Sequence, residues 1–313
     1  MGFAERRREA RSSGQYDTTK GGDRISINRQ PRESLRLWVA HIYGMELVAP
    51  PDSLISCGIF ADSAMLRVLL HGDWHAESRD GPYLFREEAL LFGPQSKRMP
   101  VSVRGGFASV GLALRPGTLY ALGDMVVEDT VDRIIPYRDL GFNQDALVER
   151  FDPASDVEVW MEALEDCVEL LIEEAGGKEP DAISAGFHHI ALADPTIPVA
   201  ECAAQLGVEK RTLERTIKRD FGLTPKQVLR RARALDMAAQ MRGVADMDEA
   251  QELALRYFDQ SHLSRDFAAL FGMTPMQFVR TPQPLLTITL ESRQARRLEE
   301  LERLPAGAKR PWQ

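Results

Sequence analysis

The chain has 313 residues, of which 44% are hydrophobic and 27% are charged, a composition typical of a globular protein with room for two domains. Its formal net charge of −8 excludes a surface that is basic throughout but permits a local basic face. Three cysteines, Cys57, Cys167 and Cys202, lie far apart in no Cys-x-x-Cys pair, so they indicate neither a disulfide framework nor a thiolate zinc site. With no apolar run of about 20 residues, we expect a cytoplasmic protein without a membrane span.

Residues 1–30 have almost no apolar periodicity. They contain the basic run Arg6-Arg7-Arg8, but nearby acidic residues such as Glu5 and Glu9 dilute its charge. We therefore expect a mobile tail rather than an arm that binds nucleic acid.

Residues 31–176 are expected to form an N-terminal domain that senses a signal or mediates dimerisation. Its first part holds short apolar runs broken by Gly and Pro, which predict an antiparallel sheet or small barrel over residues 37–43, 64–70, 89–92, 101–103 and 109–114. A short helix is predicted over residues 118–124, after the Pro116-Gly117 turn, and is expected to lie across the sheet.

Residues 144–175 predict a helix that carries one apolar stripe from Val157 to Ile172. The stripe is typical of core packing, and one half of a dimer interface remains the alternative. Gly176-Gly177 then breaks the pattern and is the best candidate for a linker between domains.

Residues 181–282 predict an all-helical domain with an internal repeat. Phe221-Gly222-Leu223-Thr224-Pro225 recurs 50 positions later as Phe271-Gly272-Met273-Thr274-Pro275, and the flanking residues match on the same shift. In the first copy, residues 199–205 predict a short helix, Gly207 a tight turn and residues 209–220 a second helix, which is the pattern of a helix-turn-helix. Thr224-Pro225 is expected to cap a long helix that ends at Gly243.

The first copy also concentrates positive charge. Residues 209–233 hold nine basic and three acidic side chains, a local excess of six positive charges. Leu213 and Ile217 define the buried side of the second helix, so Arg211, Arg215 and Lys218 are expected to face outward. A solvated helix surface would look similar, but the excess in an acidic chain favours DNA binding.

This region resembles the DNA-binding domain of AraC-type (AraC/XylS) transcriptional regulators, in which a long helix joins two helix-turn-helix units that enter successive major grooves. The second copy, from Tyr257 to Phe267 and then Phe271 to Pro275, is similar to the most recognisable segment of that family. The resemblance implies a sequence-specific transcription factor that acts on transcription initiation, with double-stranded DNA and RNA polymerase as partners and DNA-bound protein at the nucleoid. The candidate DNA-binding residues are Lys210, Arg211, Glu214, Arg215, Lys218, Gln260, Ser261, His262 and Arg265.

The second copy departs from the first in two ways. Arg256 stands where the family commonly has glycine, and residues 245–280 carry a net charge of −3. We therefore expect the first unit to supply most of the attraction to phosphate and the second to add fewer, more polar contacts. Arg215 and Arg265 occupy equivalent positions, so a shared structural ion pair is an alternative role for both.

The N-terminal domain is similar to a less-characterised domain of some family members, which implies a β-rich module with an apolar interior for a small effector of unknown identity. A homodimer is also compatible with it. The alternative is a cupin-like metalloenzyme or metal sensor, suggested by His71 and His75 near Asp73 and Glu77, in a turn that Gly72 predicts. We expect no enzyme activity, no cofactor and no metal site.

Residues 283–313 are expected to form a C-terminal extension, in which Ser292 to Leu304 predicts a short helix on the domain surface.

Overall fold

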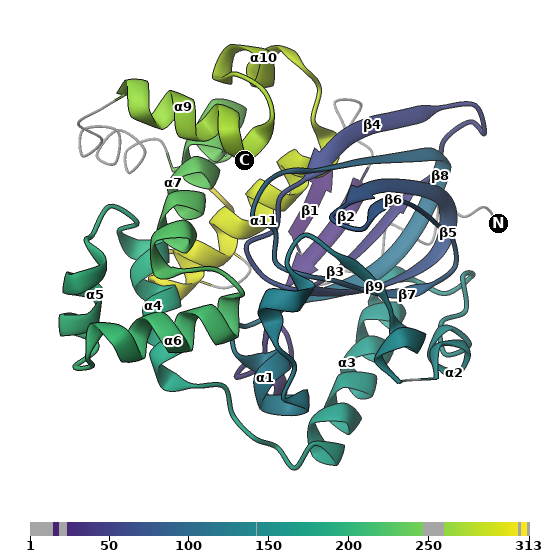
Figure 1. Cartoon of the computed structure of the whole chain (residues 1–313). Helices are drawn as coiled ribbons and strands as arrows, with labels where there is room; N and C mark the ends of the chain where they lie inside the picture. The colour runs from purple at the N-terminus through teal and green to yellow at the C-terminus, as the bar shows by residue number, and fades with distance from the viewer. Residues whose placement is uncertain (1–14, 19–23, 142, 247–259, 306–307, 312–313) are drawn as a thin grey trace.

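The computed structural model describes residues 15–18, 24–141, 143–246, 260–305 and 308–311. A curved sheet occupies one side of the molecule, helices α4 to α10 occupy the other, and α11 runs between them (Figure 1). Helices α4 to α10 all come from residues 182–280, the part of the chain that contains the internal repeat.

The N-terminal part is a sheet of nine antiparallel strands in the order β1-β2-β3-β8-β5-β7-β9, to which β4 adds on β8 and β6 on β5. Two long strands, β5 and β8, form its centre and pair with each other over most of their length. The strands are β1 Gln15–Thr18, β2 Arg24–Arg29, β3 Val39–Leu47, β4 Leu54–Ile59, β5 Met65–Ser78, β6 Gly81–Phe85, β7 Ala89–Phe92, β8 Met99–Leu114 and β9 Ile134–Pro136.

The sheet has an apolar cluster on each face because successive side chains of a strand point to opposite sides. The outer cluster joins strand residues such as Val68 and Val110 to Trp160, Met161 and Leu164 of α3 (Val157–Glu174). The predicted stripe therefore packs against the sheet as core. The inner cluster contains Met65, Leu69, Trp74, Phe92 and Phe107, and it lines the concave side.

Three expectations for this domain need correction. The tail does not extend to residue 30, because β2 pairs with β3 from Ser26↔Met45 to Arg29↔Ile42. The runs at 101–103 and 109–114 belong to one strand, β8, and Gly105-Gly106 lies inside it. His71 and His75 lie on β5 rather than in a turn. Gly72 instead lies at an irregularity inside this strand, where the pairing with β8 shifts and φ is +112°, a value that glycine tolerates.

The helices follow the predicted order, but the helix at 144–175 is interrupted between Val148 and Val157. The described helical segments also include three short 3₁₀ helices, η2, η3 and η4, of which η3 contacts α6. The bounds are η2 Glu33–Leu35, α1 Thr118–Gly123, η3 Val127–Thr130, η4 Tyr137–Leu140, α2 Gln144–Val148, α4 Ala182–Ala193, α5 Val199–Gln205, α6 Lys210–Phe221, α7 Pro225–Arg242, α9 Gln260–Phe271, α10 Pro275–Arg280 and α11 Pro284–Glu300.

Helix α11 differs most from the expectation for the C-terminal extension. It begins at Pro284, eight residues before the predicted start at Ser292, and much of it is buried. Leu285 joins the inner cluster of the sheet, whereas Leu286 and Leu290 join the core formed by α7, α9 and α10. The helix thus belongs to both halves of the molecule. Within the described ranges, no helix is long and apolar enough to cross a membrane.

Candidate nucleic-acid interface

The first repeated unit is a helix-turn-helix formed by α5 and α6. Gly207 takes a φ of +65° in the turn between them, and Ala203 is buried where the helices meet. Leu213, Ile217 and Phe221 of α6 are buried in the core of this unit. Their burial fixes which side of α6 faces outward, as the sequence predicts.

The repeat in the sequence is a repeat in the local geometry. After α6 and α9, glycines at 222 and 272 take φ values of +68° and +71° and end the helices. Thr224 and Thr274 then begin α7 and α10 with the same capping box, because each threonine hydroxyl accepts from the backbone N–H of Gln227 or Gln277, at 3.4 Å and 3.3 Å respectively.

Helix α7 joins the two units. It has 18 residues and ends at Arg242, with the predicted Gly243 as its C-terminal cap, which corresponds to a rod of about 27 Å. Consecutive major grooves on one face of DNA are separated by about 34 Å. A rigid spacer of this length suits two helices that enter neighbouring grooves.

All five candidate residues of α6 are exposed, but their environments differ. Lys210 pairs with Glu214 one turn later, with 3.7 Å between Nζ and Oε1. Arg211 and Arg215 have neither a hydrogen bond nor an ion pair within the described part of the chain, so Arg215 does not have the structural ion pair considered as an alternative. These two guanidinium groups are the side chains of α6 that are available for a ligand.

The local charge count overstated the positive charge that faces outward. Arg231 is only 2% exposed and donates to the carbonyls of Gln95 and Asp62, while Arg230 pairs with Asp266 at 3.0 Å. Arg233 donates to the carbonyl of Pro195. A count along the sequence cannot separate such structural arginines from exposed ones.

The C-terminal half of α6 lies against the N-terminal domain. Lys218 pairs with Glu128 of η3 at 3.2 Å, and Arg219 stacks over Tyr120 of α1 with 4.3 Å between guanidinium carbon and ring centre. A side-chain hydrogen bond to Asp220, with a second to Asp181, raises the pKa of Arg219. The first unit is therefore held by the domain that precedes it.

The second unit is described from α9 onward. Gln260, Ser261 and His262 lie in the first turn of α9, where only the backbone is described, and Arg265 is exposed on the same helix. Arg256 and the rest of the segment before α9, on which the expectation for that turn rests, lie outside the described residues. Phe267, Phe271 and Phe278 stack in the core beneath α9.

Comparison with known proteins agrees with this architecture. Residues 202–281 match the family model of a helix-turn-helix domain. This part of the chain is an AraC-type helix-turn-helix domain. The C-terminal part of the chain therefore has a DNA-binding fold.

Among solved structures, ToxT from Vibrio cholerae is 9% identical, with a TM-score of 0.45, over 76% of this chain and 98% of ToxT. The unsaturated fatty acid-bound form of ToxT is 10% identical, with a TM-score of 0.42, over 85% of this chain and 97% of ToxT. The AraC-like transcriptional activator CuxR is 15% identical, with a TM-score of 0.27, over 69% of this chain and 88% of CuxR. No curated protein matches the chain.

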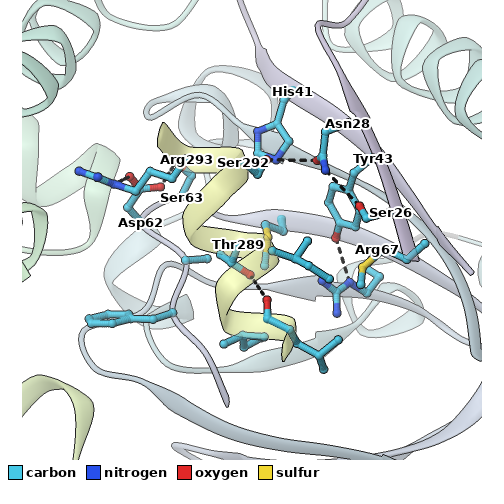
Figure 2. A pocket seen from close by; sticks show the side chains of 18 of the residues that line it. Ser26, Asn28, His41, Tyr43, Asp62, Ser63, Arg67, Thr289, Ser292 and Arg293 are labelled. Carbon is cyan, nitrogen blue, oxygen red and sulfur yellow. Dashed lines mark hydrogen bonds and ion pairs between the residues drawn. The ribbon is translucent and has the colours of Figure 1, made fainter. Parts of the chain in front are cut away.

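A cavity lies on the concave side of the sheet, where α11 forms one wall (Figure 2). Its volume, measured as the space open to the centres of water-sized spheres, is about 50 Å³, within about 670 Å³ of non-atom space that includes open solvent. The sheet side contributes Asn28, His41, Tyr43, Arg67 and Trp74, and α11 contributes Leu285, Ile288, Thr289, Ser292, Arg293 and Arg296. The cavity is thus shared by the sheet and by the helix that packs on the AraC-type domain.

Buried ion pairs connect this wall to α7 of the AraC-type domain. Asp62, which follows β4, accepts from Arg293 at 3.0 Å and from Arg296 at 3.1 Å, and Arg293 also binds Asp236 of α7. Burial opposes ionisation of Asp62, but Arg296, Arg293 and Arg231 hold its pKa well below the ordinary value. The sequence does not indicate this network, because its members are far apart in the chain and none belongs to a motif.

The histidines considered for a metal site do not form one. His75 contacts Glu77 at 3.4 Å, and His71 is exposed on the same strand. Across the described ranges, no group of three or more His, Cys, Asp and Glu residues is arranged to hold a metal ion. Cys57, Cys167 and Cys202 are buried with free thiols.

Proposed function

We propose that the protein binds specific sites in double-stranded DNA and regulates transcription initiation there, together with RNA polymerase. The first unit is the main contact: Arg211 and Arg215 read or neutralise the DNA, with Lys210, Glu214 and Lys218 beside them. The second unit adds contacts through Gln260, Ser261, His262 and Arg265.

The observation that supports this most directly is the state of Arg211 and Arg215. Both are exposed on α6, and neither is engaged by another group within the described part of the chain. An arginine that is used structurally would have a partner, as Arg230 and Arg231 have. Each bidentate contact to a base contributes about 1–3 kcal/mol of discrimination.

Gel-shift titration against the DNA upstream of the protein's own gene tests the proposal. We expect Arg211→Ala and Arg215→Ala to lose at least about tenfold in affinity, and Arg265→Ala to lose less. Arg104→Ala, an exposed arginine on β8, is the matched control and should bind like the wild type. The ranking is wrong if Arg265→Ala is the most damaging change.

The salt dependence of binding is measured on the same DNA. Log affinity should fall linearly with log salt, with a slope of about −0.9 for each phosphate that is neutralised. The role of Lys218 is tested separately, because Lys218 is paired with Glu128 in this arrangement. If Lys218 leaves Glu128 to contact DNA, Glu128→Gln should strengthen DNA binding. Unchanged affinity for DNA would show that Lys218 does not contact it.

We further propose that a small ligand in the cavity controls DNA binding through α11. One side of this helix lines the cavity, and the other packs on α7 and α9. A ligand that contacts α11 would therefore act on the spacer between the two units without touching DNA. Dimerisation through the N-terminal domain is a second form of control, and sedimentation of the full chain with and without ligand tests it.

A further inference from the structure

Arg67 is a buried cation in the interior of the sheet. It lies on β5 between Met65 and Leu69, which both belong to the inner apolar cluster, and it is 7% exposed. A guanidinium cannot lose its proton in a protein, so this side chain carries its charge into the interior. Such burial is costly unless an opposite charge accompanies it.

The described residues supply no such charge. The Nε of Arg67 donates to the hydroxyl of Tyr43 at 2.9 Å, and its guanidinium carbon lies 5.4 Å from the ring centre of Tyr43, 6.0 Å from that of Trp74 and 5.1 Å from that of Phe92. No carboxylate in the described ranges pairs with it. Contacts with aromatic faces offset only part of the free energy that it costs to desolvate a cation.

The rest of the cavity wall is also short of negative charge. Three arginines line the cavity, and Asp62 is the one carboxylate among its lining residues. Both oxygens of Asp62 are already engaged by Arg293 and Arg296. His41 adds no compensating charge, and the indole N–H of Trp74, which can only donate, has no acceptor in the described structure.

Buried nitrogens of His41, Arg293 and Arg296 also have no hydrogen-bond partner in the described structure, whereas the neutral groups of Ser26, Asn28 and Ser292 are joined to one another. Asn28 donates to Ser26 at 3.0 Å and accepts from Ser292 of α11 at 3.1 Å (Figure 2). Apolar lining is supplied by Met45, Ile59, Met65, Leu285 and Ile288. Among the described residues, the cavity therefore offers one cation without a carboxylate partner, a few donors without an acceptor and an apolar wall.

We propose that this cavity binds a small organic carboxylate. Its anionic group pairs with the two terminal nitrogens of Arg67, and its apolar body lies between the sheet and α11. A single planar guanidinium suits a carboxylate, which it binds through two parallel hydrogen bonds. A regulatory role for this site rests on the ligand control proposed above, whereas the binding of a carboxylate does not depend on it.

Isothermal titration of the full-length protein tests the site without DNA. The probes are benzoate and hexanoate, each compared with a neutral analogue, benzamide or 1-hexanol, and phenyl phosphate as a different anion. We expect the carboxylates to bind at least about tenfold more tightly than their neutral analogues, because a charge-assisted pair is lost in the latter. Tighter binding of phenyl phosphate would instead assign the site to phosphate esters and overturn the proposal.

Arg67→Met separates a ligand site from a structural role. If Arg67 is unpaired in the absence of ligand, this variant should fold with an unchanged or higher Tm and should bind benzoate and hexanoate about 10- to 100-fold more weakly. Arg86→Met, which changes an exposed arginine directly after β6, is the matched control and should bind like the wild type. Carboxylate binding that survives Arg67→Met, or the failure of both carboxylates to bind at millimolar concentration, would overturn the proposal.

A DNA titration in the presence of the carboxylates distinguishes the two proposals. Carboxylate binding without a change in DNA affinity would keep the site and reject ligand control. If the protein binds specific DNA but neither carboxylate, the proposed DNA-binding function stands and the proposed carboxylate site is wrong.

Discussion

Replacing Asp62 by alanine should destabilise the protein more than any other single change to a charged residue near the cavity. Asp62 binds Arg293 and Arg296, whose side chains are each 5% exposed. After the change, Arg293 keeps its contact with Asp236, whereas Arg296 loses the only carboxylate that it contacts in the described structure. One buried guanidinium is left without a counter-charge.

The expected cost follows from that single unpaired charge. Removing one partner of a buried ion pair costs about 3–5 kcal/mol, and we expect the lower end because Arg293 remains paired. Replacing both partners removes the unpaired charge, so Asp62→Ala combined with Arg296→Met should cost at least about 1 kcal/mol less than the sum of the two single changes.

Urea denaturation of the full chain at pH 7, followed by circular dichroism, measures these free energies of unfolding. Asp73→Ala is the control, because Asp73 and its partner Arg86 are 50% and 64% exposed and such pairs contribute at most about 1 kcal/mol. The reasoning is refuted if Asp62→Ala costs no more than Asp73→Ala, or if the double variant shows simple additivity.

Two further predictions concern pH and helix capping. Burial, with a contribution from Arg296, lowers the pKa of His41 to about 3, and burial lowers the pKa of His188 to about 4. Both side chains therefore stay neutral in the folded protein, whereas in the unfolded chain they take up a proton near pH 6.5. Stability should therefore fall between pH 7 and pH 5, by about 2 kcal/mol for each histidine, and His188→Gln should remove its share in urea titrations at the two pH values. Thr224→Ala removes a capping box and should cost about 1 kcal/mol, whereas Thr224→Ser should retain most of it; equal thermal stability of the two variants would contradict the role of the cap.

The sequence determined the elements of the AraC-type domain closely because their signals are local. Gly207 and Gly222 mark positions of positive φ, Thr224-Pro225 marks a helix start, and the spacing of Leu213 and Ile217 selects the buried side of α6. Each signal acts within a few residues, so neighbouring sequence suffices to recognise it. The equal caps at Thr224 and Thr274 show that the repeat was also structural.

Tertiary structure decided which charges are available and where the C-terminal helix lies. Arg211 and Arg231 are equivalent in a charge count, yet Arg211 is exposed with no partner among the described residues, and Arg231 is buried against two carbonyls. Arg67 lies in an apolar run of the sequence, and only the packing of the sheet around it shows a cation without a counter-charge among the described residues.

Helix α11 gives the clearest contrast between the two levels. From the sequence alone it was a charged segment expected on the surface, because arginine and glutamate are usually solvated. In the fold, its arginines find Asp62 and Asp236 from two different domains, and burial becomes possible through these pairs. Residues distant in sequence set this outcome, whereas the local pattern set the helix itself.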